Sequence, residues 1–373
     1  MRGLHSTISR LTEFRRRAPV QDDGADSHLT SFEDFGSNPG ALRGWTYVPD
    51  GLPKHAPLVV VLHGCTQTAN GYDRASGWSS AADEHGFALL FPEQQRSNNH
   101  NLCFNWFARD DASRGQGEAL SIRQMIAALQ ARHGTDPKRT FVTGLSAGGA
   151  MSAAMLATYP EVFAGGAVIA GLPFGTAQSV PEAFDRMRGH DGTTAETLAD
   201  LVRSASSHPG PWPTLSVWHG TNDRTVDRSN AAALMDQWRT LHGAASAPCR
   251  SDTIAGYPHR AWCDSAGREV VEDYAITGMG HGTPLNTSAD GGETLAPYML
   301  EAGISSTRHI LAFWGIAGVP EDEVRQSRPQ AQREAPQKPF VAGVGASPKQ
   351  PVSNVQKTIE AALRSAGLLD RTG

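Results

Sequence analysis

The chain has 373 residues, of which 39% are hydrophobic and 19% are charged, so it is long enough and apolar enough to form a folded core. Its 33 lysines and arginines against 38 aspartates and glutamates give a formal net charge of −5. This charge argues against sequence-independent binding of nucleic acid, because such binding requires an excess of cations. No apolar run approaches the roughly 20 residues of a membrane-spanning helix, and the longest, such as residues 58–62, have the length of a strand.

Residues 1–38 are expected to form an N-terminal flank that is first basic and then polar. Leu4, Ile8 and Leu11 recur at helical spacing among arginines, which predicts either a short basic amphipathic helix or a frayed tail. A secretory signal would instead place an apolar block of about 7–15 residues after a basic start, and a start site other than Met1 would change this interpretation.

Residues 39–319 alternate between strand and helix patterns and are expected to form one catalytic domain. Seven segments have the apolar or alternating patterns typical of strands, namely 41–48, 57–62, 87–91, 140–145, 164–170, 215–218 and 270–276. Four segments have helical spacing, namely 118–133, 147–158, 230–241 and 307–314. This alternation predicts an α/β fold with a mostly parallel, doubly wound sheet that is covered on both faces.

Three further segments depart from this alternation. Residues 172–212 contain short helical patterns at 182–188 and 195–205, and we interpret them as an insertion between two strands, either a pocket wall or a surface excursion without a role. Residues 320–351 are rich in proline and glutamine, which is the composition of a linker. Residues 352–369 begin with a capping box and continue at helical spacing, which predicts a short amphipathic helix.

The strongest chemical signal is the sequence Gly-Leu-Ser-Ala-Gly at residues 144–148, between a predicted buried strand and a predicted helix of small residues. A nucleophilic serine at a strand end needs a sharp turn, and glycines on both sides remove side chains that would clash with the neighbouring backbone. The N-terminus of the following helix directs its amides toward the reacting centre. The pattern therefore predicts Ser146 as a nucleophile.

A nucleophilic serine needs a base, and the base needs a carboxylate that orients it. Asp223 follows the strand at 215–218, at the sheet edge where sites form, and is the expected acid, with Asp227 as the alternative. His281 follows the strand at 270–276 among small residues and is the expected base. Three other histidines are expected to be structural, surface or helix-packing residues: His219, His259 and His309.

Two backbone N–H groups are expected to stabilise the oxyanion of the tetrahedral intermediate. One belongs to Ala147, directly after the nucleophile, and the other is expected from the loop that follows an early strand. In this sequence that loop gives Cys65 as the donor, and Gly64 would permit a tight turn. The chain itself supplies this machinery and its cysteines lack zinc-site spacing, so no metal and no organic cofactor are expected.

Six segments in this order resemble the polyhydroxybutyrate depolymerase family of esterases: 63–67, 101–107, 144–149, 170–174, 219–223 and 280–282. The resemblance covers roughly residues 40–317 and implies an α/β-hydrolase fold, with the helical insertion after the sixth strand. It also implies a serine esterase that cleaves ester bonds of short-chain polyhydroxyalkanoate polymers or oligomers through an acyl-enzyme. A feruloyl or acetylxylan esterase is the alternative, and a granule- or surface-binding protein is the alternative from outside the enzymes.

The same resemblance implies the disulfides Cys65–Cys103 and Cys249–Cys263, whereas the residues alone are equally compatible with four reduced thiols. Disulfides form in oxidising compartments, so the protein is expected to be extracellular or periplasmic, with the cytoplasm as the alternative. The expected partner is an ester substrate, without nucleic acid or a membrane span, and the oligomeric state is left open. Candidates for substrate contact are His63, Trp106, Phe107, Leu172 and Phe174, for which core packing is the alternative.

Overall fold

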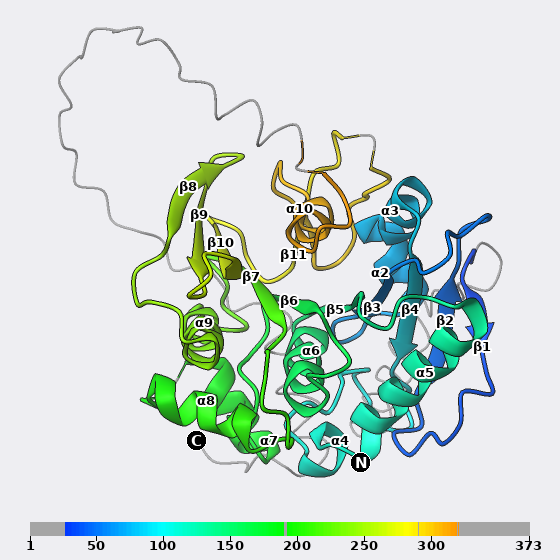
Figure 1. Cartoon of the computed structure of the whole chain (residues 1–373), viewed down its shortest axis with the longest axis horizontal. Helices are drawn as coiled ribbons and strands as arrows, with labels where there is room; N and C mark the ends of the chain where they lie inside the picture. The colour runs from blue at the N-terminus through cyan, green and yellow to red at the C-terminus, as the bar shows by residue number, and fades with distance from the viewer. Residues whose placement is uncertain (1–26, 190–191, 290, 319, 321–373) are drawn as a thin grey trace, which may run out of the picture.

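A computed structural model describes residues 27–189, 192–289, 291–318 and 320 (Figure 1). The predicted N-terminal helix or tail, the remainder of the linker at 320–351 and the predicted helix at 352–369 lie outside the described residues. Within the described ranges, no helix is both long and apolar enough to cross a membrane.

A ten-stranded sheet runs through the middle of the molecule, in the order β1-β2-β4-β3-β5-β6-β7-β10-β9-β8 (Figure 1). Its six central strands are parallel: β4 (Ala88–Glu93), β3 (Leu58–Leu62), β5 (Thr140–Leu145), β6 (Gly165–Ile169), β7 (Thr214–Gly220) and β10 (Glu269–Ile276). Antiparallel strands extend both edges: β2 (Arg43–Tyr47) and β1 (Thr30–Phe32) on one, β9 (Tyr257–Cys263) and β8 (Arg250–Ile254) on the other. The mostly parallel sheet predicted from the sequence is therefore present.

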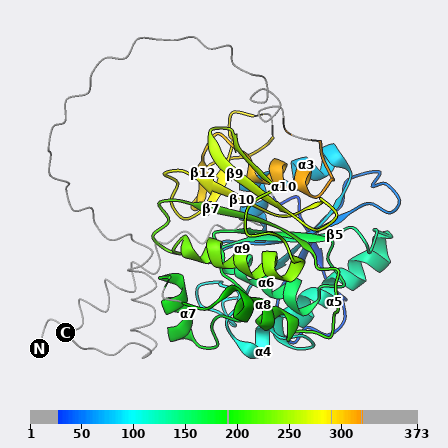
Figure 2. The same ribbon diagram turned by 60° about the vertical axis from the view of Figure 1, so that its left-hand side comes forward.

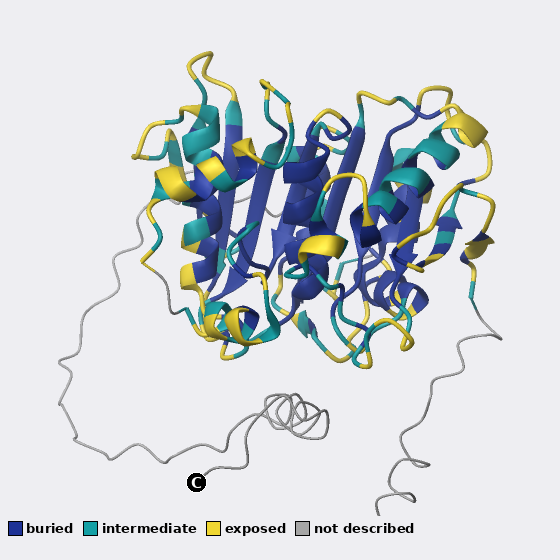
Figure 3. Ribbon diagram, turned by 90° about the horizontal axis from the view of Figure 1, so that it is seen from below, coloured by how far each residue is buried: buried dark blue, intermediate teal, exposed yellow. Residues whose placement is uncertain are grey.

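Helices cover both faces of this sheet (Figures 1 and 2). One face carries α4 (Arg109–Ala112), α5 (Gly117–His133), α6 (Ala147–Thr158), α7 (Val180–Met187), α8 (Ala195–Arg203) and α9 (Ser229–His242). The opposite face carries α2 (Ala69–Ser76), α3 (Trp78–His85) and α10 (Ser306–Phe313). A hydrophobic cluster lies on each side, and Figure 3 shows the buried strands between the two helical layers.

The central elements are apolar because they are covered on every side. Every residue of β3 is buried, which explains why its sequence is a continuous Leu-Val-Val-Val-Leu run rather than an alternating one. Helix α6 is likewise buried along its whole length, and its alanines and glycines allow it to lie close to the sheet. These two elements carry the backbone on which the candidate active site is built.

The predicted insertion lies between β6 and β7 and contains α7 and α8. It is attached to α9 by the buried Gln237, whose Nε2 donates to the carbonyl oxygens of Phe174 and Leu198 (3.1 and 2.8 Å). The Oε1 atom of Gln237 accepts the backbone N–H of Phe174 (3.1 Å). These contacts fix the insertion against the helical layer.

Several elements were not predicted from the sequence. Strand β1 extends the sheet from within the segment that we expected to be an N-terminal flank. Helices α2 and α3, the short helix α4, the hairpin of β8 and β9, and a small parallel sheet of β11 (Thr283–Leu285) and β12 (Met299–Glu301) were also missed. This small sheet follows His281 directly and therefore adjoins the candidate active site.

Candidate active site

Ser146 occupies the turn between β5 and α6 with φ 57° and ψ −117°, a backbone conformation that a non-glycine residue rarely adopts. The glycines on either side make this turn possible. A Cβ atom on Gly148 would overlap the carbonyl oxygens of Leu62 and His63, and one on Gly144 would overlap the backbone of Gly148. The turn therefore holds the serine at the end of β5 and lies directly against the chain that leaves β3.

His281 joins Ser146 to Asp223. Its Nε2 lies 2.9 Å from the Ser146 Oγ, and its Nδ1 lies 2.7 Å from the Asp223 Oδ2. The other carboxylate oxygen of Asp223 accepts the backbone N–H groups of Thr225 and Val226 (2.8 and 3.0 Å). The structure thus brings the predicted nucleophile, base and acid into one hydrogen-bonded chain.

The surroundings of Asp223 favour its ionised form. Burial raises the pKa of the carboxyl, but the hydrogen bond and the charge of His281 outweigh burial, so the pKa of Asp223 lies below its usual value. An ionised carboxylate at Nδ1 keeps the proton on that nitrogen and leaves the Nε2 lone pair facing the serine hydroxyl.

Asp227 and His219 lie near this chain but are not part of it. Asp227 accepts the backbone N–H of Ser229 at the start of α9 (2.9 Å). The Nε2 of His219 donates to the carbonyl oxygen of Val226 (2.9 Å) and lies 3.5 Å from the Asp223 Oδ2. Burial lowers the pKa of His219, and the charge of the neighbouring Asp223 opposes that shift.

The loops that carry Asp223 and His281 are hydrogen-bonded to each other. The backbone N–H of Asn222 donates to the Met279 carbonyl oxygen (3.0 Å), and that of Gly278 donates to the Thr221 Oγ1 (2.9 Å). Strands β7 and β10 end side by side in the sheet, so the two loops start next to each other. The hydrogen bonds between the loops then hold Asp223 and His281 at a fixed separation.

Both predicted disulfides, Cys65–Cys103 and Cys249–Cys263, are present. The first fixes the loop after β3, where Cys65 lies. In the described part of the chain, neither the Cys65 nor the Ala147 backbone N–H has a hydrogen-bond partner, so both are free to bind a ligand atom. No group of three or more His, Cys, Asp or Glu residues in the described ranges could hold a metal ion.

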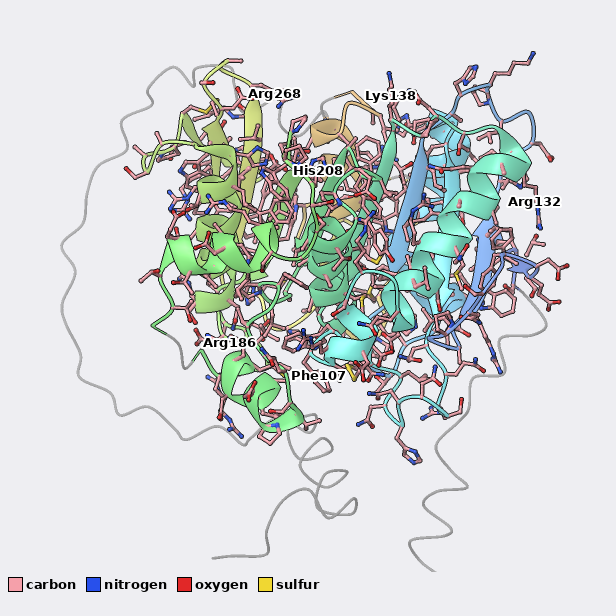
Figure 4. All side chains as sticks on the ribbon, turned by 60° about the horizontal axis from the view of Figure 1, so that its bottom comes forward. Phe107, Arg132, Lys138, Arg186, His208 and Arg268 are labelled. Carbon is pink, nitrogen blue, oxygen red and sulfur yellow. A yellow bond between two sulfur atoms is a disulfide. The ribbon has the colours of Figure 1, made fainter. Side chains whose placement is uncertain are left out.

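The five substrate-contact candidates separate by burial. His63, Leu172 and Trp106 are buried, whereas Phe107 and Phe174 are only partly buried. The Trp106 and Phe107 rings meet edge to face, with centroids 5.6 Å apart, and Figure 4 shows Phe107 at the end of the molecule where α4 and α7 lie. The two phenylalanines therefore retain exposed surface, whereas the other three candidates are packed in the core.

His63 is 1% exposed, and both its ring nitrogens are bonded within the protein. Its Nδ1 donates to the Gly64 carbonyl oxygen (2.8 Å), and its Nε2 accepts the backbone N–H of Gln94 (3.2 Å). Burial lowers the pKa of His63. These contacts describe a neutral histidine that supports the loop carrying Cys65.

The sequence analysis missed Tyr298, whose ring lies edge-on to the His281 ring with centroids 6.1 Å apart. Its φ is 65°, an uncommon value for a bulky residue and a mark of local strain. The Thr283 N–H donates to its carbonyl oxygen (2.8 Å), and Leu295, three residues earlier, is 66% exposed. No sequence signal announces this contact, because it depends on the pairing of two three-residue strands, β11 and β12.

Comparison with known proteins supports the resemblance. Residues 44–254 match the family model described as esterase PHB depolymerase. Over 293 residues, 78% of this chain and 70% of the relative, the sequence is 47% identical to poly(3-hydroxyalkanoate) depolymerase C of Paucimonas lemoignei. The chain belongs to the esterase PHB depolymerase family. This membership makes the protein a carboxylic ester hydrolase, as the sequence predicted.

The chain is also similar, at lower identity, to other esterases. An acetylxylan esterase of Coprinopsis cinerea is 32% identical over 263 residues, covering 69% of each chain. The solved structure of an acetyl xylan esterase from Aspergillus awamori superimposes with a TM-score of 0.66 at 26% identity, covering 78% of this chain and 99% of that one. The predicted α/β-hydrolase fold is thereby confirmed.

Proposed function

We propose that this esterase works through an acyl-enzyme, with Ser146 as the nucleophile, His281 as the general base and Asp223 as the residue that orients the base. The observation that carries the proposal is the hydrogen-bonded chain from the Ser146 Oγ through both nitrogens of His281 to Asp223, with distances of 2.9 and 2.7 Å. A nucleophile, a base and an orienting carboxylate in this arrangement recur on unrelated folds that perform acyl transfer.

The reaction begins when the Ser146 Oγ attacks the ester carbonyl carbon while the His281 Nε2 takes the hydroxyl proton. The tetrahedral intermediate collapses as His281 gives that proton to the leaving alcohol, and the acyl group remains on the serine. Water then attacks the acyl-enzyme with the same histidine as base, which releases the acid. The N–H groups of Cys65 and Ala147 are the proposed oxyanion donors, each lowering the activation barrier by about 2.7–4 kcal/mol.

For the substrate we propose esters of short-chain polyhydroxyalkanoates, either polymer or oligomer. The 47% identity to a poly(3-hydroxyalkanoate) depolymerase supports this class over the 32% identity to an acetylxylan esterase. A feruloyl or acetylxylan ester is the second candidate, supported by the similarity to acetylxylan and feruloyl esterases. Phe107 and Phe174 are the proposed apolar contacts for the acyl chain.

A substrate panel with Ser146→Ala as control tests the mechanism and the substrate together. The parent enzyme is expected to release product faster from polyhydroxybutyrate film and hydroxybutyrate oligomers than from methyl ferulate or acetylated xylan. Ser146→Ala is expected to lower kcat on p-nitrophenyl butyrate by about four orders of magnitude or more, because no other group replaces the nucleophile. Retained turnover in this variant would contradict the mechanism, and a preference for ferulate or xylan would favour the second candidate.

We also propose that the protein works in an oxidising compartment, either outside the cell or in the periplasm. Two disulfides support this proposal, since such bonds are rare in reducing compartments. Thiol titration of unfolded, unreduced protein from its native host is expected to find no free thiol, and a result of four free thiols would indicate the cytoplasm.

A further inference from the structure

Residues 94–105 lie between β4 and α4 and contact the loop that carries Cys65. We name residues 94–105 the supporting loop. Two contacts join these two loops. The Thr66 N–H donates to the Asn101 carbonyl oxygen (2.7 Å), and Cys65 is bonded to Cys103. The position of Cys65 therefore depends on where the supporting loop lies.

A single buried carboxyl holds both ends of the supporting loop. The Oε1 atom of Glu118, in the first turn of α5, accepts a hydrogen bond from the Gln94 Nε2 (2.5 Å). Its Oε2 atom accepts the backbone N–H of Asn105 (2.9 Å). The first and last residues of the loop are thus tied to one side chain, which is 0% exposed and which the proposed mechanism does not use.

Gln94 extends this connection toward the active site. The Nε2 atom that reaches Glu118 also donates to the Cys103 carbonyl oxygen (3.1 Å), and the backbone N–H of Gln94 donates to the His63 Nε2 (3.2 Å). The opposite nitrogen of His63 donates to the Gly64 carbonyl oxygen (2.8 Å). An unbroken path of hydrogen bonds therefore runs from Glu118 to the Gly64 carbonyl.

The end of this path decides where the Cys65 N–H points. The Gly64 carbonyl and the Cys65 N–H belong to one peptide unit, which is planar and trans, so the two bonds point in opposite directions. Fixing the carbonyl oxygen against His63 therefore fixes the direction of the N–H that we propose as an oxyanion donor.

We propose that Glu118 is a positioning residue for oxyanion stabilisation, acting through Gln94 and His63 on the peptide that carries the Cys65 N–H. This inference rests on the proposed function, because it assigns the Cys65 N–H to the tetrahedral intermediate. Burial and the charge of Asp111 raise the pKa of Glu118 to about 8, and the two donated hydrogen bonds oppose that rise. The Gln94 and Asn105 donors favour the ionised form, in which both carboxylate oxygens accept hydrogen bonds, so the variants below are compared above pH 8.

Glu118→Gln is the direct test, because it keeps the size of the side chain but turns one accepting oxygen into an NH₂ that faces an N–H donor. One end of the supporting loop is then released. Since the oxyanion exists only in the transition state and intermediates, kcat on p-nitrophenyl butyrate is expected to fall about 10- to 100-fold with KM nearly unchanged. Affinity for a trifluoromethyl ketone, which forms a tetrahedral adduct with serine, is expected to fall by the same factor, while affinity for butyrate stays constant.

Glu293→Gln is the matched control. Glu293 is also buried, accepts the Asn286 N–H and the Ser305 hydroxyl (2.6 and 2.5 Å), and lies on the opposite face of the sheet. Its replacement is expected to lower stability without changing the ratio of ketone to butyrate affinity. If Glu118→Gln does not fold, Gln94→Met supplies the measurement, because it removes the side-chain link at one end only and is expected to shift the same ratio.

Two results overturn the inference, and the Ser146→Ala variant shows whether the proposed function fails with it. An unchanged affinity ratio in the folded Glu118 or Gln94 variant overturns it, and so does an equal shift in the Glu293 variant. If Ser146→Ala retains activity, the proposed function itself fails. If Ser146→Ala is inactive while the Glu118 variant keeps its ketone affinity, only the positioning role of Glu118 fails.

Discussion

Two aspartates four residues apart follow β7, yet only Asp223 contacts His281. The backbone accounts for the difference. The Thr225 and Val226 N–H groups hold one Asp223 oxygen and turn the other toward the imidazole, whereas Asp227 is engaged at the start of α9. In the proposed mechanism Asp223 stabilises the imidazolium that forms on His281, whereas Asp227 is held at the start of α9 instead.

Asp223→Asn tests this assignment. The backbone N–H groups keep holding the asparagine carbonyl, so its NH₂ faces the His281 Nδ1 and favours the wrong tautomer. We expect kcat on p-nitrophenyl butyrate to fall by about 10⁴ with the fold intact. Asp227→Asn is the control and is expected to keep kcat close to that of the parent enzyme. A larger loss in the Asp227 variant would reverse the assignment.

Residues within local motifs could be predicted from the sequence, whereas residues that act across the chain could not. The serine, acid and histidine each follow a recognisable strand. Glu118 and Tyr298 acquire their contacts from partners that no local pattern identifies. The expectation that His259 lies on the surface or packs in a helix is wrong: it is 0% exposed in β9, hydrogen-bonded to Asp252 and Glu272. Such buried pairing depends on the register of three strands.

The helices and strands that could be predicted from the sequence are mainly those that are buried. Strands covered on both faces read as apolar runs, so β3, β5 and β6 were predicted within one or two residues of their bounds. Strand β8 is polar and mostly exposed at the sheet edge, so its sequence lacks the alternation of a half-buried strand. Helices α2 and α3 are only eight residues long and mix small with polar residues, which leaves no clear helical periodicity.

The two disulfides are expected to have different effects when removed. Cys249–Cys263 closes the β8–β9 hairpin at the edge of the sheet, across a separation of 14 residues. Replacing both cysteines by serine is expected to lower the free energy of unfolding by about 3 kcal/mol without changing kcat. Replacing Cys65 and Cys103 by serine is expected to lower both the free energy of unfolding and kcat, because that bridge joins the Cys65 loop to the supporting loop.

Urea unfolding and initial rates of the two double variants separate these effects. The edge-strand variant serves as the control for loss of a disulfide as such. Equal losses of kcat in both variants would mean that global loosening, rather than the Cys65 loop, limits the reaction.

At the scale of the whole molecule, the residues proposed for catalysis and the hydrogen bonds that link them lie between residues 27 and 318. The sheet, both hydrophobic clusters and the two disulfides also lie within that range. The formal net charge of −5 is compatible with a substrate that is neutral as an ester and leaves as an acid. We expect this range to form the catalytic unit, and deletion of residues 320–373 tests that expectation.

Deleting residues 320–373 is expected to leave kcat/KM on p-nitrophenyl butyrate unchanged, because the residues proposed for catalysis lie within residues 27–318. The same truncated protein is compared with the full chain on polyhydroxybutyrate film. Loss of film hydrolysis alone would assign these residues to adsorption on the solid polymer. Loss of soluble-ester hydrolysis or of folding would contradict the prediction and show that the segment supports the domain.

The proposed oxyanion donors are both backbone N–H groups, which limits how this active site can vary. Replacing the side chain at position 65 or 147 leaves the N–H in place, except with proline, which has none. Substitution can therefore change where these donors point far more readily than whether they exist. Variation in activity among related sequences should accumulate in the residues that aim the donors, at a distance from the serine, and a survey limited to substrate-lining positions would overlook it.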